Sequence, residues 1–338
     1  MKIAILSPIA WRTPPRHYGP WEQVASNHAE GLVRAGHDVT LFATADSSTA
    51  GRLEAVCQAP YEEDASLEPK VWECLHIAHL MERANQFDII HNHYDFLPLT
   101  YSRLIETPMV TTIHGFSSPR ILPVYRAYND HVSYVSISNA DRSSELNYIA
   151  TVYNGIQPEL FTLRREPGQY LLFFGRIHPD KGTREAIEIA RRTKIPLIIA
   201  GIIHDEDYFE RAVHPAIDGE FIQYRGPVGP SARDDLLGAA LALLHPISFN
   251  EPFGLSVAEA MLCGTPVVAF PRGSMPELIR DGETGYLVNS IEEAAEAVAA
   301  LKREPSRIDR RRCRAWAEAN FTVETMVRGY LSVYEQIL

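Results

Sequence analysis

The chain has 338 residues, of which 46% are hydrophobic and 22% are charged, an ordinary balance for a protein with a packed core. At this length we expect two domains, each able to bury a core of its own. The 32 basic and 43 acidic residues give a net charge of −11, which argues against nucleic acid as the main partner.

The N-terminus and the cysteines indicate a cytoplasmic protein. Residues 1–6 form a short strand pattern that Pro8 interrupts, so they do not resemble a signal peptide. No apolar run approaches the roughly 20 residues needed to span a bilayer. The four cysteines form no CxxC pair, so we expect reduced thiols.

In the first half, short apolar runs alternate with helical patterns, which predicts a parallel sheet covered by helices. The expected helices are 21–35, which ends at Gly36, and 70–86. The expected strands are 2–7, 38–43, 88–91, 109–113 and 132–136.

A segment rich in glycine and proline, 154–169, separates the two halves, and we interpret it as an interdomain hinge. The strand pattern then resumes, and the tail 322–338 has one apolar stripe typical of a helix. We therefore expect one domain over 1–160, a second over 161–320, and a helix over 321–338 that packs back toward the N-terminal domain. The second-half strands are expected at 170–174, 197–200, 221–224, 241–245 and 267–270.

The most informative segment is Glu251 to Glu259, which follows an expected strand and opens an expected helix. Pro252 can begin a helix, and Gly254 lets a ligand approach the backbone. The amides of Phe253 to Ser256 suit an anion such as a diphosphate. The two flanking carboxylates can each accept hydrogen bonds from neighbouring sugar hydroxyls.

Three further residues lie at expected strand ends. Arg176 follows the first strand of the second half, and Lys181 precedes the next helix; both cations can neutralise a departing diphosphate. His114 ends a strand of the first half, where a neutral imidazole can hydrogen-bond a sugar hydroxyl.

Taken together, these residues resemble the pattern of retaining glycosyltransferases of family 4 (glycosyl transferases group 1), over essentially the whole chain. The resemblance implies the GT-B fold, an α/β architecture of two doubly wound Rossmann-like domains facing a central cleft. It implies that the domain over 1–160 lies on the acceptor side and that the domain over 161–320 binds the nucleotide sugar. It also implies a hexosyltransferase that uses a nucleoside-diphosphate sugar of the UDP-glucose or GDP-mannose type as co-substrate, with neither cofactor nor metal ion.

The resemblance also implies a role for each residue. Arg176, Lys181 and the amides around Phe253, Gly254 and Leu255 would stabilise the departing diphosphate. Glu259 would hold the ribose, Glu251 the hydroxyls of the sugar, and His114 the sugar from the opposite domain. The acceptor hydroxyl would attack on the face that the diphosphate leaves, and a phosphate oxygen would take its proton.

Two loops depart from the family pattern. Many relatives have Gly-Gly before the first helix, whereas this chain has Gly19-Pro20, and Pro20 has no amide hydrogen. Gly19 remains a candidate donor contact. In the loop 273–277, Ser274 stands where relatives usually have a second glycine.

The acceptor stays open: a saccharide, a small metabolite or a lipid-linked group. Candidate acceptor-side residues are Arg12, Arg16 and His17, in a segment that equally fits a rigid surface loop. The basic run 302–314 is more typical of a solvated helix face than of a membrane patch, so membrane association is not indicated, although an anionic lipid acceptor remains open.

Two patterns resemble metal sites but are better explained otherwise. The acidic triplet 205–207 precedes a helix, where acids favour the helix dipole. His76 with His79, and His91 with His93, have ligand-like spacing without a completing carboxylate or cysteine pattern.

Two alternatives to the main interpretation remain. An inverting GT-B transferase or a sugar-nucleotide epimerase could use His17 or His114 as a base. A non-catalytic sugar-nucleotide-binding protein is the alternative from another functional class.

Overall fold

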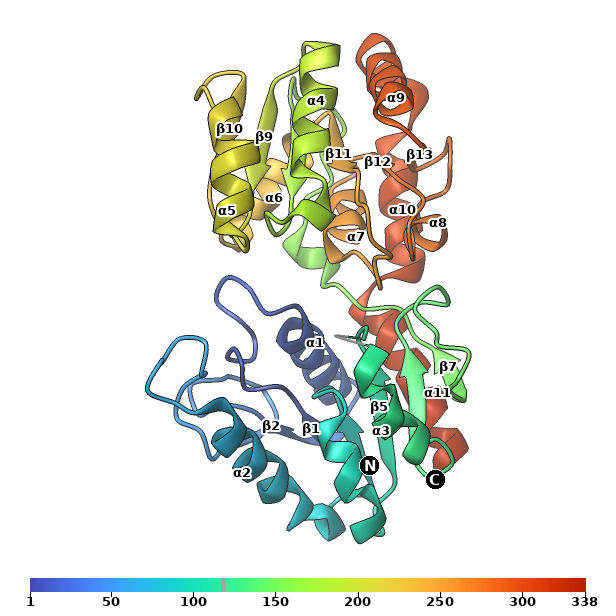
Figure 1. The fold of residues 1–338 in the computed structure, drawn as a ribbon. Coiled ribbons are helices and arrows are strands. Elements are labelled where there is room, and N and C mark those ends of the chain that lie inside the picture. The colour runs from blue at the N-terminus through green and yellow to red at the C-terminus, as the bar shows by residue number, and fades with distance from the viewer. Residues whose placement is uncertain (117–118) are drawn as a thin grey trace. The chain divides into compact units, whose positions relative to one another are not determined.

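The computed structural model describes residues 1–116 and 119–338, which form two compact α/β units (Figure 1). Unit 1 comprises Met1–Gly155 together with Val323–Leu338, and unit 2 comprises Ile156–Thr322. In the described part of the chain, no helix is long and apolar enough to cross a membrane.

Unit 1 is built on a seven-stranded, all-parallel sheet in the order β3-β2-β1-β4-β5-β6-β7. The central strands are apolar on both faces because helices cover both; residues 3–6 of β1 are fully buried. The strands are β1 (Lys2–Leu6), β2 (Asp38–Phe42), β3 (Arg52–Glu54), β4 (Ile89–Asn92), β5 (Met109–Ile113), β6 (Ser133–Ser136) and β7 (Tyr148–Thr151).

The helices of unit 1 include the last one in the chain. That helix, α11, packs on α1 at Gly31, where an added Cβ would lie 2.5 Å from Val327 Cγ2. The absence of a side chain at Gly31 therefore permits the close approach of the two helices. The helices are α1 (Pro20–Arg34), α2 (Pro69–Met81), α3 (Leu122–Ala127) and α11 (Val323–Ile337).

Unit 2 has a six-stranded, all-parallel sheet in the order β10-β9-β8-β11-β12-β13. Its strands are β8 (Leu171–Phe174), β9 (Leu197–Ala200), β10 (Ile222–Tyr224), β11 (Ala242–His245), β12 (Val267–Ala269) and β13 (Gly285–Leu287). Its helices are α4 (Thr183–Thr193), α5 (Glu206–Tyr208), α6 (Pro230–Ala239), α7 (Leu255–Leu262), α8 (Met275–Leu278), α9 (Ile291–Arg303) and α10 (Arg310–Asn320).

Both sheets reverse their strand order once, between β1 and β4 in unit 1 and between β8 and β11 in unit 2. In an open parallel sheet, ligands bind outside the carboxyl ends of the strands at such a point. The loops after β8 and β11 are therefore the first place to look for a site in unit 2.

The basic run 302–314 differs from the expected solvated helix face, because two of its arginines point inward. Arg310 is 4% exposed and donates to the carbonyls of Arg164, Gly238 and Ala240. Burial lowers the pKa of its guanidinium. Arg314 donates to the carbonyls of residues 161 and 262, so these cations bind the protein's own backbone.

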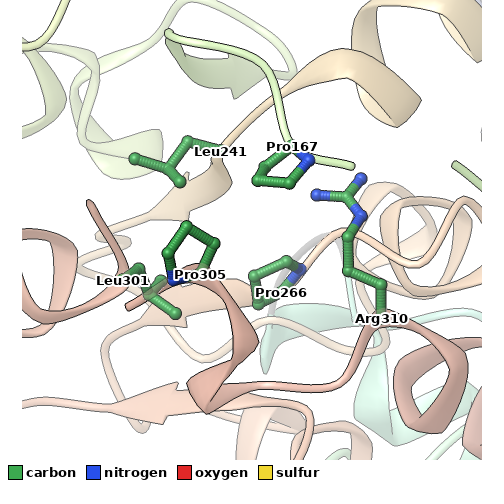
Figure 2. A pocket seen from close by; sticks show the side chains of 6 residues that line it. All are labelled: Pro167, Leu241, Pro266, Leu301, Pro305 and Arg310. Atoms are coloured by element: carbon green, nitrogen blue, oxygen red, sulfur yellow. The ribbon is translucent and has the colours of Figure 1, made fainter. Parts of the chain in front are cut away.

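Arg310 also lines a small, mainly apolar pocket of unit 2 (Figure 2). Leu241 and Pro266 immediately precede β11 and β12, so the pocket lies at the amino ends of these strands. That edge is opposite the one where ligands bind in such folds. The other lining residues are Pro167, Leu301 and Pro305.

Candidate active site

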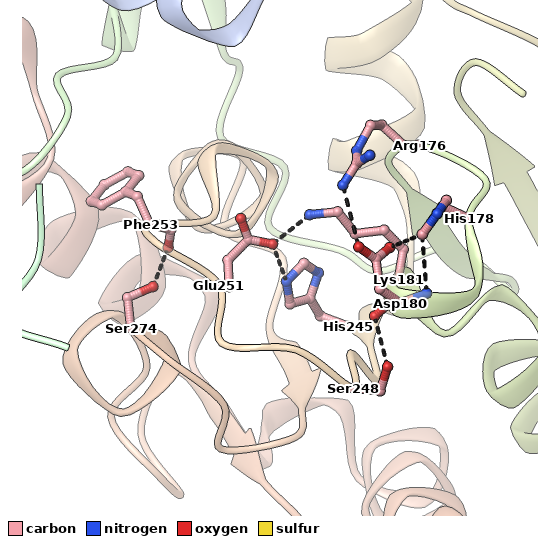
Figure 3. A network of polar contacts seen from close by, with 9 residues as sticks. All are labelled: Arg176, His178, Asp180, Lys181, His245, Ser248, Glu251, Phe253 and Ser274. Atoms are coloured by element: carbon pink, nitrogen blue, oxygen red, sulfur yellow. Dashed lines mark hydrogen bonds and ion pairs between the residues drawn. The ribbon is translucent and has the colours of Figure 1, made fainter. Parts of the chain in front are cut away.

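The loops that follow β8 and β11 are joined by an ion pair between two of the expected site residues. Lys181 Nζ lies 2.5 Å from Glu251 Oε2 (Figure 3). The Lys181 ammonium also lies 4.5 Å from the centre of the Phe249 ring, a cation–π contact. The structure thus brings Lys181 and Glu251 together.

Glu251 is stabilised as a carboxylate. Burial alone would raise its pKa, but His245, at 3.7 Å from Oε2, and Lys181 outweigh that effect and lower the pKa to about 2. In the described residues, no hydrogen-bond partner reaches Glu251 Oε1. This oxygen is therefore available to accept from a sugar hydroxyl.

Close backbone contact fixes the two loops against each other. Gly182 has a φ of 76°, and a Cβ there would lie 2.0 Å from the carbonyl oxygen of Pro246. The amide of Ser248 donates to the Asp180 carbonyl at 2.9 Å. Gly182 is therefore needed for both its left-handed backbone and its lack of a side chain.

Arg176 is the second cation of this edge. Its Nη2 lies 3.4 Å from Asp180 Oδ2, and within the described residues this is its only ion pair (Figure 3). His178 Nδ1 approaches the other oxygen of Asp180 at 2.7 Å. Asp180 thus orients Arg176 and leaves most of its guanidinium donors for a ligand.

The expected helix start at Pro252 is wrong, because α7 begins at Leu255. Gly254 is the N-cap, and its φ of 93° turns the chain into the helix only after the proline. The amides of Leu255 and Ser256 belong to the first helical turn, where no helical acceptor exists. The helix start that would suit an anion therefore lies at Leu255, a few residues later than expected.

The serine that departs from the family loop has a structural role here. The Ser274 hydroxyl donates to the Phe253 carbonyl at 2.6 Å (Figure 3). The Ser274 amide donates to the Glu251 carbonyl at 2.9 Å. The Phe253 ring is buried against Phe321. The backbone on both sides of Pro252 is thus held in place.

Glu259 lies on α7 and is buried. Its Oε1 accepts from Arg233 Nη1 at 2.9 Å. Burial raises the pKa of Glu259, and the Arg233 cation offsets only part of that effect. Arg233 is thus a neighbour of the expected ribose-binding carboxylate that the sequence did not reveal.

In unit 1, His114 directly follows β5 and is 7% exposed. Its Nε2 shares a 2.8 Å hydrogen bond with His93 Nδ1, and its ring stacks on Trp21 at 5.6 Å. Burial lowers the pKa of His114 to about 3, so the ring is neutral at physiological pH.

The candidate acceptor-side residues lie before α1. Arg12 and Arg16 both approach Asp46, at 3.9 and 3.1 Å, and Arg16 also pairs with Glu63. His17 is exposed. Gly19 is the N-cap of α1 with a φ of 146°, and it is tightly packed, since a Cβ there would lie 2.9 Å from Glu22 Oε2.

Three neighbours of the expected residues escaped the sequence interpretation: Asp180, Arg233 and His245. His245 had a usable signal, because it is a polar residue at the end of a buried strand, six positions before Glu251. Arg233 had none, since its pairing with Glu259 depends on how α6 packs against α7.

The two metal-like patterns have structural explanations. Asp205 is the N-cap of α5, accepting from the Tyr208 amide at 2.8 Å. His28, His91 and His93 have ring nitrogens within 4.8 Å of one another. Every one of those nitrogens is already hydrogen-bonded, and the rings of His91 and His93 are stacked, which suits a hydrogen-bond chain better than a converging ligand set.

Two protein-family models together match most of the chain. Residues 22–160 match the model of Glycosyltransferase Family 4, and residues 161–320 match that of Glycosyl transferases group 1. The D-inositol 3-phosphate glycosyltransferase of Pseudarthrobacter chlorophenolicus is 28% identical, over 88% of each chain.

Two solved structures have a similar fold. Sucrose-phosphate synthase from Thermosynechococcus elongatus has a TM-score of 0.81 at 19% identity, covering 100% of this chain and 99% of that one. HepE from Anabaena, solved in complex with UDP-glucose, has a TM-score of 0.75 at 20% identity, covering 99% of this chain and 100% of that one.

Proposed function

This chain belongs to the group 1 glycosyltransferases and has the GT-B fold, and from that premise we propose that it transfers a hexose from a nucleoside-diphosphate sugar to a hydroxyl acceptor with retention of configuration. The observation that carries the donor assignment is the Lys181–Glu251 pair at the switch point of unit 2. It combines a cation for phosphate with a carboxylate for sugar hydroxyls.

For the donor we propose UDP-glucose, because HepE, a structural neighbour, was solved with that compound. Arg176, Lys181 and the amides at the start of α7 would neutralise the leaving diphosphate, so that no metal ion is needed. Glu259 would bind the ribose and Glu251 the sugar. By the resemblance to the family, we assign His114 a hydrogen bond to the transferred sugar.

In the proposed reaction, the bond between the anomeric carbon and the β-phosphate oxygen breaks while the acceptor oxygen bonds to the same face of that carbon. The acceptor proton passes to a phosphate oxygen of the leaving nucleoside diphosphate. Burial keeps the pKa of His114 at about 3, which makes that imidazole a poor general base and supports this route over an inverting one that uses His114.

The test is turnover of UDP-glucose, measured as UDP release, together with the anomeric configuration of the product. We expect Glu251→Ala to lower turnover by about tenfold or more, because hydrogen bonds to charged groups contribute roughly 1.5–3 kcal/mol. Glu210→Ala, an exposed acid of unit 2, is the matched control. Near-normal turnover by folded Glu251→Ala would remove Glu251 from the site, and an inverted product would exclude the proposed route.

A further inference from the structure

A continuous chain of hydrogen bonds runs through the core of unit 1 from α11 to His114. It begins at the Tyr330 hydroxyl, which lies 2.8 Å from Thr112 Oγ1, and Thr112 Oγ1 lies 2.7 Å from His91 Nε2. His91 Nδ1 then lies 2.6 Å from the Tyr334 hydroxyl. These four residues are buried.

The second half of the chain consists of three histidines. The Tyr334 hydroxyl lies 3.3 Å from His28 Nε2, and His28 Nδ1 lies 2.9 Å from His93 Nε2. His93 Nδ1 lies 2.8 Å from His114 Nε2. The chain ends there, since the other ring nitrogen of His114 has no partner among the described residues.

All members of the chain are neutral, because burial lowers the pKa of each histidine and raises that of both tyrosines. A neutral imidazole donates through one nitrogen and accepts through the other. Each histidine therefore passes the direction of its hydrogen bonds on. The Thr112 and Tyr334 hydroxyls could accept from both neighbours, but their own buried protons would then have no acceptor among the described residues, so they pass the direction on as well.

The hydroxyl proton of Tyr330 decides the direction of these hydrogen bonds. Tyr330 is fully buried, and Thr112 is the only hydrogen-bond partner of its hydroxyl among the described residues. If the bonds ran away from His114, the Tyr330 proton would be buried without an acceptor, which is costly. If they run toward His114, every proton of the chain has an acceptor up to the last nitrogen.

We propose that this chain fixes the tautomer of His114, with His93 as the positioning residue that donates to Nε2, so that Nδ1 carries a proton and donates to an oxygen of the bound sugar. The hydrogen bond to the sugar rests on the proposed function, whereas the tautomer of His114 does not. His114 then selects a group that can accept a hydrogen bond at this position.

The first test needs no substrate. In protein labelled with 15N in its histidine rings, His114 should show a protonated Nδ1 and an unprotonated Nε2, with signals assigned by their loss in His114→Gln. A protonated Nε2 in the wild-type protein would overturn the proposal, whether or not the protein turns over UDP-glucose.

A pair of variants then tests His93 itself. In His93→Asn, the side-chain amide can replace Nδ1 as donor to His114, so we expect the 15N pattern to persist and kcat/KM for UDP-glucose to fall by no more than about threefold. In His93→Gln, the amide lies closer to the position of Nε2, so His114 should lose its fixed tautomer and kcat/KM should fall by about tenfold.

The matched controls are His76→Asn and His76→Gln. His76 is also fully buried in unit 1, but its Nε2 contacts the Ser7 carbonyl, outside the chain. Both controls should leave the His114 signals unchanged. Equal effects of the two His93 variants on those signals would reduce His93 to a packing role and overturn the proposal.

Discussion

The carboxylates of Glu251, which is partly buried, and Glu22, which is buried, have opposite pKa shifts, because different groups surround them. Lys181 and His245 lower the pKa of Glu251 to about 2 against the effect of burial. Glu22, on α1, accepts from amides such as that of Trp11 among the described residues, and burial raises its pKa to about 7. Glu251 is therefore a permanent anion at physiological pH, whereas Glu22 titrates there.

Glu22 should make stability depend on pH. Its pKa rises from 4.5 in the unfolded chain to about 7 in the folded one, so its contribution is fully present below pH 4.5 and is lost as the pH rises through 7. The loss amounts to about 3 kcal/mol at most. We expect Glu22→Gln to unfold at a higher urea concentration than the wild type at pH 8, and at a similar one at pH 4.5.

The exposed Glu82→Gln variant on the same unit is the control, and its urea midpoint should follow the wild type at both pH values. If Glu22→Gln also followed the wild type across this range, Glu22 would not be a buried, protonated carboxyl near neutral pH.

Several residues of the candidate site could be named from the sequence because they lie in loops that follow strongly apolar strands. Lys181 and Glu251 were both predicted in such loops, and the structure pairs them. Their pairing was not predictable, since it depends on contacts across 70 residues of sequence. The direction of the hydrogen bonds between Tyr330 and His114 could not be predicted from a sequence pattern either.

At the scale of elements, the site depends on backbone contacts between loops. Gly182 has a φ of 76°, and Gly282, elsewhere in unit 2, has a φ of 75° with open space around it. A substitution at Gly282 therefore tests backbone strain alone, whereas the same substitution at Gly182 adds steric overlap.

We expect Gly282→Ala to destabilise unit 2 by about 1 kcal/mol through the left-handed backbone alone. Gly182→Ala should cost about 1–3 kcal/mol more, because its Cβ would overlap the Pro246 carbonyl, and it should weaken UDP-glucose binding by displacing Lys181. Urea unfolding and calorimetric titration measure the two effects; equal destabilisation by both variants would show that the loops can separate at little cost.

Edge strands show where the sequence was insufficient. The three unpredicted strands, β3, β7 and β13, all lie at the edge of a sheet and have three or four residues. Edge strands are only partly buried, so they lack the continuous apolar run of the central strands. The expected helix 70–86 likewise ends early, since α2 stops at Met81 and a 3₁₀ turn follows at Ala84–Gln86.

At the scale of the whole molecule, the chain leaves unit 1 after Gly155 and returns to it at Val323. Unit 1 therefore needs the last helix for its core, to which Tyr330 and Tyr334 contribute fully buried rings. Unit 2, in contrast, is formed by one continuous segment.

This division predicts a selective effect at Gly31. We expect Gly31→Leu to separate α11 from α1, because even a Cβ there would lie 2.5 and 2.7 Å from methyl groups of Val327 and Val323. Calorimetry should show unit 1 melting at a lower temperature while unit 2 is unchanged. Arg34→Leu, at an exposed position on α1, should leave the melting temperatures of both units unchanged. If Gly31→Leu lowered the melting temperatures of both units equally, the effect would not be selective for unit 1.

The return of α11 to unit 1 also sets an order of events during synthesis on the ribosome. All residues of unit 2 are translated before those of α11, so its core can form before that of unit 1 is complete. The first 155 residues must wait, with the space that α11 fills still open, until α11 has been translated. That helix is also the one whose Tyr330 hydroxyl orders the protons as far as His114.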